Sequence, residues 1–457
     1  MADLDYETQD NSGGGGSDSS EDVNDAYSYL YMPSVVDRVH IEGLNRTKTE
    51  FLVPELKKIL DATTFGEVVA FTLQAKELLN SLDIFKKVDV YIDTSQGSKA
   101  SPNGFDVTLT VQEKRFVTSS VGTQVGNNEG SMVFGAKLNN VFGKAEGLKA
   151  DLGFGTKTKS SYQLVYSKPV SINPSKSFQV GVQKATTDYP TSSHKELTRG
   201  VNFSFTLPSN LGVHTIGWEG VWRNLTGMEP RTSFSVRKNA GHSLKSSLTH
   251  VLVADTRDHP SFPTEGSLFK LTQELAGLGG DVQFLKNNIE TQKNVEIHED
   301  VVLSCSAQGG IMNRPPNTRT QINDRFFLGG PLSVRGFHMR GIGPRDKMDS
   351  LGAEAYWSVG LHLYTPLPFR PAQGSIGDHI KTHVFVNAGN LVSIDSSLPW
   401  KQQLNPLVQN TRWSCGIGLV LLLGIARLEL NYCLPRGYQR TDRINRGLQF
   451  GLGVNFL

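Results

Sequence analysis

The chain has 457 residues, enough for one large domain and a smaller one, and its formal net charge is only +2. Such a small charge excludes a global field that would attract nucleic acid, so we expect no nucleic-acid partner. The 46 glycines and the hydrophobic content of 38% favour many short strands over helices. The three cysteines, Cys305, Cys415 and Cys433, fit neither a disulfide framework nor the ligand spacing of a metal site.

Residues 1–34 form an acidic leader that we expect to be disordered. The first 30 residues hold eight acidic side chains and no Lys or Arg, with a GGGG run at 13–16. This composition matches neither a secretory signal nor a mitochondrial presequence. No segment approaches the ~18 consecutive apolar residues of a spanning helix, although a closed β-barrel would also satisfy all backbone groups within a bilayer.

Residues 35–114 predict a small α+β domain in the order β–α–α–β–β. VVDRVHIEG (35–43) alternates as a strand, and TKTE (47–50) predicts a capping box in which Thr47 and Glu50 open a helix towards Leu60. Two strands, KKVDVYID (86–93) and FDVTLTVQE (105–113), follow the second helix. That helix is predicted to bury the residues spaced at i, i+3 and i+4: Val68, Phe71, Ala75, Leu78 and Leu82.

Residues 115–457 change to short alternating runs, of which LKADLGFG (148–155) and VNFSFTL (201–207) are typical. About sixteen such runs are present, and the segment 232–238 is ambiguous between strand and loop. This number is typical of a transmembrane β-barrel, whose outer face is apolar and whose lumen is polar. A soluble sandwich or propeller is the alternative, but the count exceeds one sandwich and no repeat marks propeller blades. We therefore predict an all-β transmembrane barrel of about 16 antiparallel strands, preceded by the α+β domain.

The alternation stops over residues 311–350, where the chain reads GGPLSVRGFHMRG at 329–341. Long irregular insertions in compact domains are either functional or disordered. A solvated surface arginine is the simple interpretation of Arg335, but the flanking glycines allow tight backbone paths and Phe337 disfavours a solvated loop. A guanidinium folded into a lumen would require a partner on the inner wall. No arrangement of His, Ser, Cys or acidic residues predicts an enzyme, a metal site or a cofactor site.

At these residues the chain resembles a known family. GGPLSVRGF is similar to the inward-folding loop of the outer-membrane β-barrel assembly superfamily, whose hallmark is V/I-R-G-F/Y. SLDIFKKVDVYID (81–93) resembles a single polypeptide-transport-associated (POTRA) domain, with Asp83 where that signature usually has glycine. The end of the chain, QFGLGVNFL, is similar to the sorting signal of mitochondrial barrel precursors. The loop motif comprises Gly329, Gly330, Val334, Arg335, Gly336 and Phe337, and the terminal signal comprises Gln449, Gly451, Val454 and Phe456.

One POTRA-like domain without a secretory signal resembles the mitochondrial branch of the superfamily, the core barrel subunits of the sorting and assembly machinery (SAM complex). VGNNEGSM (125–132), EAYWSVGLHLYTPLPFRP (354–371) and IARLELNYC (425–433) strengthen this resemblance. It implies an insertase in the mitochondrial outer membrane, with the POTRA domain in the intermembrane space. The implied partners are β-barrel precursors such as porins, metaxin-like accessory subunits, the lipid bilayer and cristae contact-site proteins. The alternatives are a passive diffusion pore and a polypeptide-translocating barrel of the same superfamily.

The resemblance also implies partners for the loop arginine. In the family this arginine pairs with an acid on the inner face of a later strand, and the matching position here is Asn387. On the neighbouring strand, His362 stands where bacterial relatives have an acid. We therefore expect Arg335 to hydrogen-bond to these neutral groups rather than to form an ion pair.

A lateral seam is expected between the first strand (about 115–125) and the last (446–457). Strand glycines lose packing and backbone entropy, so glycines on both sides could weaken such a seam. A tight bend of the barrel would also require them, and the sequence leaves both interpretations open. The glycines concerned are Gly122 and Gly126 near the first strand and Gly447, Gly451 and Gly453 in the last.

Overall fold

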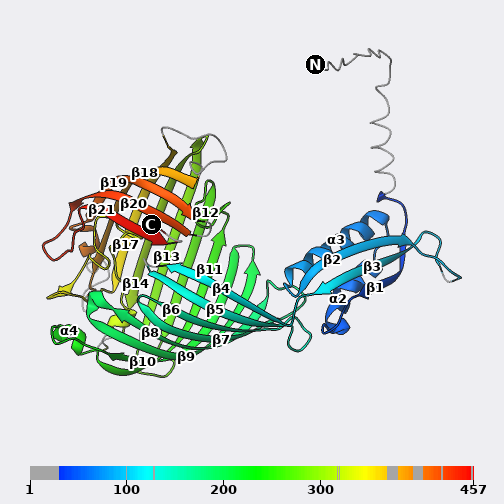
Figure 1. Ribbon diagram of the computed structural model, residues 1–457, viewed down its shortest axis with the longest axis horizontal. Coiled ribbons are helices and arrows are strands. Elements are labelled where there is room, and N and C mark those ends of the chain that lie inside the picture. Colours follow the sequence, from blue (N-terminus) through cyan, green and yellow to red (C-terminus); the bar gives the residue numbers. More distant parts are fainter. Residues whose placement is uncertain are drawn as a thin grey trace, which may run out of the picture. The chain divides into compact units, whose positions relative to one another are not determined.

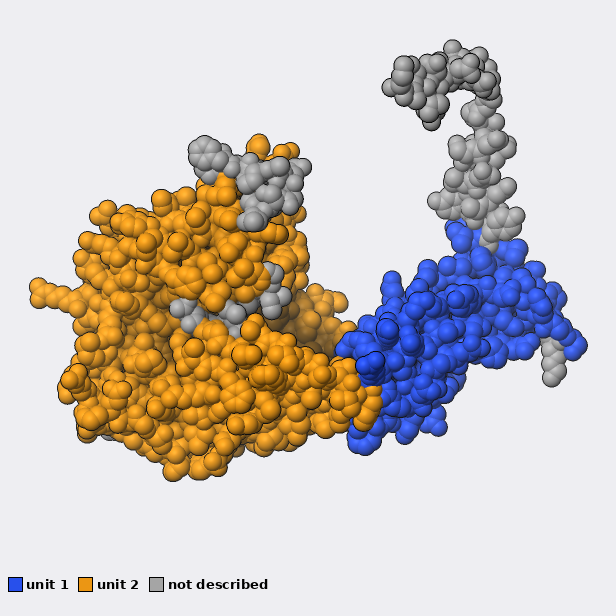
Figure 2. All heavy atoms as spheres, in the orientation of Figure 1, with its two compact units in different colours: residues 1–115, 140–145, 171–174 blue, residues 116–139, 146–170, 175–457 orange. Residues whose placement is uncertain are grey.

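The chain divides into two compact units (Figure 2). The computed structural model describes residues 30–457, except 99, 127–128, 316–317, 319, 368–378, 395–404, 424–425, 454–455 and the side chains of 124–126. The predicted disorder of the leader therefore falls almost entirely outside the described residues. The first unit extends to Arg115 and includes residues 140–145 and 171–174. The sequence predicts these two turns as part of the barrel domain, which it begins at residue 115, but they belong to the first unit.

The first unit is a three-stranded sheet with two helices on one face (Figure 1). The strand order is β1-β3-β2, in which β3 lies parallel to β1 and antiparallel to β2. Leu52, Ile59, Val68 and Leu109 are buried between helices and sheet. Among the described residues, no helix is both long and apolar enough to cross a bilayer. The elements are β1 (Val35–Glu42), α2 (Thr49–Leu60), α3 (Phe65–Ser81), β2 (Phe85–Thr94) and β3 (Gly104–Glu113).

The capping box predicted at Thr47 is wrong. Helix α2 begins at Thr49 after Lys48, which makes no side-chain cap, and the Thr47 hydroxyl donates instead to the Glu113 carboxylate at 2.6 Å. A carboxylate is a stronger acceptor than the competing uncharged groups, so the threonine turns away from the helix. It is α3 that carries a side-chain cap, because Thr64 accepts a hydrogen bond from the backbone N–H of Glu67 at 3.3 Å.

Asp83 lies where the POTRA signature usually has glycine, and its backbone conformation explains why glycine is usual at this position. Its φ is +59°, in the left-handed region that glycine adopts without strain. Aspartate is among the few other residues that tolerate this conformation, because its short side chain can hydrogen-bond locally. In this structure the Asp83 carboxylate forms an ion pair with Lys114. The departure from the signature therefore preserves the turn between α3 and β2.

The second unit is one antiparallel sheet of 16 strands, which confirms the predicted barrel architecture (Figure 1). Every strand pairs with its neighbours along the chain, and β14 pairs with β17 across a long insertion. The ambiguous segment 232–238 contains a short helix, α4 (Phe234–Arg237). The strands are β4 (Val117–Gly126), β5 (Glu129–Asn139), β6 (Gly147–Gly155), β7 (Thr158–Pro169), β8 (Ser177–Tyr189), β9 (His194–Ser209), β10 (Gly212–Thr226), β11 (Gly241–Asp255), β12 (Gly266–Ala276), β13 (Phe284–His298), β14 (Val301–Asn313), β17 (Ala355–Pro366), β18 (Ile380–Val392), β19 (Arg412–Leu423), β20 (Ala426–Gly437) and β21 (Gly447–Gly453).

Side chains alternate between the two faces of this sheet, as the sequence predicted. The outer face exposes rows of large apolar residues, among them Leu152, Phe154, Phe203 and Phe205. The inner face carries ion pairs such as Lys245–Glu274 and Lys270–Glu290. A soluble fold would hide such extended apolar rows from water, whereas a transmembrane barrel turns them towards lipid.

Candidate functional site: the inward-folding loop and the last strand

The insertion between β14 and β17, residues 314–354, folds onto the inner wall of the barrel. The predicted bounds of 311–350 are shifted, since β14 continues to Asn313 and β17 begins at Ala355. The loop contains η2 (Ile322–Asp324) and the paired segments β15 (Arg345–Asp346) and β16 (Asp349–Ser350). Val334, Arg335 and Phe337 are each fully buried. This burial excludes the solvated surface arginine.

The loop glycines allow turns and close contacts that other residues would block. Gly329, Gly330 and Gly336 have φ of +100°, +131° and +82°, which are conformations that favour glycine. A methyl group on Gly336 would lie 3.2 Å from the Cβ of Ser414 on β19, closer than the wall permits without movement. The sequence therefore fixes the path on which the motif arginine approaches the wall.

Arg335 forms an ion pair with Glu429 on the inner face of β20. Its Nε donates to Oε2 of Glu429 at 3.0 Å and its Nη2 to Oε1 at 3.2 Å, and both side chains are completely buried. A third bond runs from Nη1 to the main-chain oxygen of Leu457 at 3.3 Å. The guanidinium also lies 5.2 Å from the ring centre of Phe385. A bidentate, charge-assisted contact of this kind specifies both the position and the orientation of the loop.

The prediction that Asn387 and His362 hold Arg335 is wrong, although both are buried nearby on the inner wall. They stand at the far end of a hydrogen-bond chain. The amide of Asn431 donates to Glu429 at 2.8 Å, so its carbonyl accepts from Nδ1 of His383 at 3.1 Å. Nδ1 of His362 then donates to Nε2 of His383 at 2.9 Å. Asn387 approaches Nε2 of His362 at 3.5 Å and completes the chain.

The expectation from the sequence does not include Glu429, because it follows the family positions, which fall on β17 and β18. A sequence signal was present. Glu429 stands between Leu428 and Leu430 in an alternating run, and it is the only acidic residue between Asp395 and Asp442. Since Leu430 is exposed on the outer face, alternation alone turns the carboxylate inward.

A side chain of the last strand binds the backbone of the same loop. Gln449, the first residue of the predicted terminal signal, accepts a hydrogen bond from the N–H of Gly336 at 3.0 Å and donates to the carbonyl of Phe337 at 2.7 Å. Phe456 is buried, and its ring centre lies 5.6 Å from the guanidinium of Arg335. Val454, the remaining member of the predicted signal, lies outside the described residues. The loop motif and the end of the chain therefore form one site.

The glycines of the last strand face the loop. A methyl group on Gly451 would lie 3.0 Å from Cβ of Pro331, and one on Gly453 would lie 2.9 Å from Cδ2 of Leu332. Close approach of the loop is thus a further reason for glycine at both positions, beside the two interpretations that the sequence leaves open. At Gly122 an added methyl group would meet open space, and Gly126 ends β4 opposite Glu129.

Strands β4 and β21 stand at the two ends of the sheet order. Within the described ranges, the two strands form no ladder with each other, whereas every other pair of neighbours in the sheet does. The described part of β21 has seven residues, fewer than that of any other strand of this sheet. The loop and the last strand therefore meet beside the least paired part of the barrel.

A second buried ion pair holds the first arm of the loop. Arg223 on β10 donates to Asp324 of η2 at 2.7 Å and 3.1 Å and to Gln321 at 3.2 Å. Lys286 on β13 donates to the carbonyl of Asp324 at 2.8 Å. Sequence reasoning did not identify this anchor, because nothing in the local pattern pairs residues about 100 positions apart.

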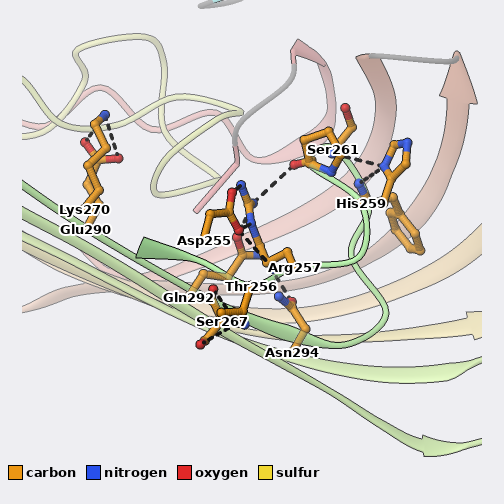
Figure 3. Close-up of polar contacts among 12 residues, drawn as sticks. Asp255, Thr256, Arg257, His259, Ser261, Ser267, Lys270, Glu290, Gln292 and Asn294 are labelled. Atoms are coloured by element: carbon orange, nitrogen blue, oxygen red, sulfur yellow. Dashed lines mark hydrogen bonds and ion pairs between the residues drawn. The ribbon is translucent and has the colours of Figure 1, made fainter. Parts of the chain in front are cut away.

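The connection between β11 and β12 also enters the lumen. Arg257 is held between the carboxylate of Asp255, at 2.9 and 2.8 Å, the carbonyl of Pro260 and the amide of Gln292 (Figure 3). This arrangement directs the buried Phe262 against the ring of Tyr364 on β17, with ring centres 4.9 Å apart. Two loops thus occupy the lumen from different strands.

The contacts of this site hold the loop in place. Within the ranges that the structure describes, no three His, Cys, Asp or Glu side chains are grouped so that they could share a metal ion. What the residues provide is a buried charge pair, backbone clamps and packed rings, all of which position a loop against the wall and the last strand.

Comparison with known proteins identifies the family. The model of the Omp85 superfamily domain matches residues 140–456. A Bos taurus relative, "Sorting and assembly machinery component 50 homolog", is 49% identical over 425 residues, which are 93% of this chain and 90% of the relative. A Schizosaccharomyces pombe relative, "SAM50-like protein SPAC17C9.06", is 33% identical over 93% of this chain and 91% of its own length.

A solved structure shows the same fold. BamA from Haemophilus ducreyi lacking POTRA domains 1–3 superimposes with a TM-score of 0.75, at 18% identity, over 92% of this chain and 84% of that one. The match extends across both units, so it covers the N-terminal α+β unit as well as the barrel. The chain belongs to the Omp85 superfamily and, within it, to the family of the sorting and assembly machinery component 50 homologues.

Proposed function

We propose that this protein folds β-barrel precursors and inserts them into the mitochondrial outer membrane, as the core barrel of a sorting and assembly machinery. Its relatives carry the name of that machinery, and its fold is that of BamA. The observation that carries the proposal is the site itself. There the loop that carries Arg335 binds the last strand, which forms no ladder with the first strand of the sheet.

The seam supplies the backbone hydrogen bonds that a client strand needs during insertion. A half-folded client exposes backbone N–H and C=O groups that hydrocarbon cannot satisfy. A barrel edge with free backbone groups pairs with such a strand by β-augmentation, and the client grows as a sheet extension. The loop at Arg335 keeps the last strand in place while the seam between β4 and β21 opens.

Orientation and partners follow from the same proposal. The N-terminal POTRA unit faces the intermembrane space, where it receives precursors such as porins, and metaxin-like accessory subunits bind the barrel. A role with cristae contact-site proteins rests on the family alone. A passive diffusion pore is disfavoured, because residues 314–354 and the β11–β12 connection both occupy the lumen. No observation separately favours a translocating barrel.

Disulfide trapping tests the seam. A cysteine at Val121, an exposed residue of β4, in a background without the three native cysteines should form a disulfide with a cysteine in the last strand of an imported porin precursor. The matched control is Ile216→Cys, exposed on β10, whose two neighbours are fully paired. Equal crosslinking at both positions, or none at Val121, would contradict a lateral seam.

A further inference from the structure

The outer face of strands β6–β11 carries a feature that insertion does not explain. A row of four side chains crosses neighbouring strands, because Tyr162 on β7 pairs with Lys184 on β8, Lys184 with Arg199 on β9, and Arg199 with Trp222 on β10. All four side chains are exposed, on the face where rows of apolar residues turn away from the lumen.

The two cations in this row lie directly opposite each other without a carboxylate. The guanidinium of Arg199 lies 5.3 Å from the ring centre of Trp222, and Nζ of Lys184 lies 5.8 Å from that of Tyr162. Among the described residues, neither cation forms an ion pair with Asp or Glu. Like charges directly opposite on neighbouring strands destabilise a sheet, so the row favours an anion between them.

An apolar hollow adjoins the two cations. Its volume of about 650 Å³ falls within the range of roughly 300–1,000 Å³ that ligand sites occupy. Gly220 borders the hollow, and the ring of Trp218 packs beside it, since an added methyl group would lie 2.9 Å from Cη2 of Trp218. The apolar lining comprises Ala150, Leu152, Leu164, Val182, Val201 and Leu244.

The position of the row suits the boundary between hydrocarbon and headgroups. Tyr and Trp collect at this level in transmembrane barrels, and here they flank both cations. A Lys or Arg on the lipid face is strongly unfavourable at the bilayer midplane and almost neutral near the interface. Along the face of β8 that carries Lys184, the alternate residues are apolar on one side of it, at Phe178, Val180 and Val182, and polar on the other, at Thr186 and Asp188.

We propose that this hollow binds one membrane phospholipid with an anionic headgroup. Its phosphate lies between Lys184 and Arg199, which donate charge-assisted hydrogen bonds, and an acyl chain lies along the hollow past Val182, Val201 and Gly220. The site requires the barrel to lie in a membrane, but it does not depend on assembly activity. Lipid retention and client insertion can therefore fail separately.

Native mass spectrometry of the purified full-length protein in a neutral detergent tests the proposal. Phosphatidylinositol is added in one arm and phosphatidylcholine in the other. The unmodified protein should retain phosphatidylinositol in preference to phosphatidylcholine. The double variant Lys184→Gln, Arg199→Gln should bind phosphatidylinositol at least about tenfold more weakly, as expected from the loss of charge-assisted hydrogen bonds.

The matched control is Lys293→Gln. Lys293 is also exposed and stands on β13 beside Cys305, away from the row. This variant should retain phosphatidylinositol as the unmodified protein does. Far-UV circular dichroism should give the same spectrum for all variants, because every substitution is on the surface.

Three outcomes would overturn the proposal. The first is equal retention of the two lipids, and the second is an equal loss of binding in the double variant and the Lys293 control. The third is displacement of the lipid by inorganic phosphate or by an acidic peptide at similar concentration, which would indicate a simple anion site or a protein contact. The proposal also expects that Val201→Phe, which narrows the hollow, weakens lipid binding although both cations remain.

Discussion

The inward-folding loop is anchored twice, and the two anchors differ in what they connect. At Arg335 the loop supplies the cation and the wall supplies Glu429, whereas at Asp324 the loop supplies the acid and the wall supplies Arg223. The first anchor adjoins β21, the terminal strand of the sheet, through Gln449. The second stands on β10, which is laddered on both sides. One anchor therefore joins the loop to the terminal strand of the sheet, and the other joins it to a strand that is paired on both sides.

The strongest test of this comparison is Glu429→Gln. The substitution leaves Arg335 and Arg427 buried without their shared carboxylate, and removal of one partner from a buried ion pair costs about 3–5 kcal/mol. We expect a lower denaturation midpoint of the barrel in detergent and a marked loss of porin assembly in organelles that carry the variant. The control is Glu299→Gln, an exposed residue of the β13–β14 turn. Normal assembly by the Glu429 variant would remove this anchor from the mechanism.

Asp324→Asn should separate stability from activity. Unlike the two arginines at Glu429, Arg223 keeps other partners, the amide of Gln321 and the nearby carboxylate of Glu196, so the loss should be about 1.5–3 kcal/mol, the contribution of hydrogen bonds to charged groups. Because β10 is far from the seam in the sheet order, porin assembly should remain near that of the unmodified protein. The same two measurements apply. Assembly that declines as steeply as in the Glu429 variant would show that the two anchors act as one.

The variant Gln449→Leu tests the first anchor and leaves its ion pair, Arg335–Glu429, intact. The change removes the partners of the Gly336 N–H and the Phe337 carbonyl, and each buried group left unsatisfied costs about 1–3 kcal/mol. We expect reduced assembly and faster hydrogen exchange at Gly336. Leu448→Ala, an exposed neighbour on the same strand, provides the control. Unchanged exchange at Gly336 would contradict the clamp.

Glu113, in the first unit, should show a smaller effect that depends on pH. Its carboxylate holds residues 45–47, in contrast to the two anchors of the barrel loop. Burial alone would raise the pKa of its carboxyl, but hydrogen bonds from Thr47 and the backbone of Arg46 and Asn45 lower it overall. A carboxyl with a lowered pKa stabilises the fold above its usual range and loses that contribution as the pH falls through the folded value. Protection of the Asn45–Thr47 amides, corrected for intrinsic exchange, should therefore decline below about pH 4.

The variant Glu113→Gln should lack this pH dependence, and Glu42→Gln, exposed on β1, should retain it. Equal protection of residues 45–47 at all pH values in the unmodified protein would show that the carboxylate does not hold this segment.

The local pattern was sufficient for the strands and for the loop. Alternation predicts about sixteen strands, because successive side chains of a strand point to opposite faces of the sheet. The backbone groups of each strand form hydrogen bonds with neighbouring strands. The break in alternation located the insertion, and glycines with positive φ marked its turns. The capping box failed at Thr47 because a carboxylate 66 residues away competed for the hydroxyl.

The sequence by itself determined the barrel, the α+β unit and the importance of Arg335, since these depend on periodicity and on residue types that neighbours in the chain impose. Only the tertiary structure decided which wall groups meet the loop. The inward residues of β18 and β20 are equally acceptable to alternation, and the path of the loop across the lumen selects Glu429 over Asn387. A buried guanidinium requires a charged partner, so the loop settles where the wall offers one.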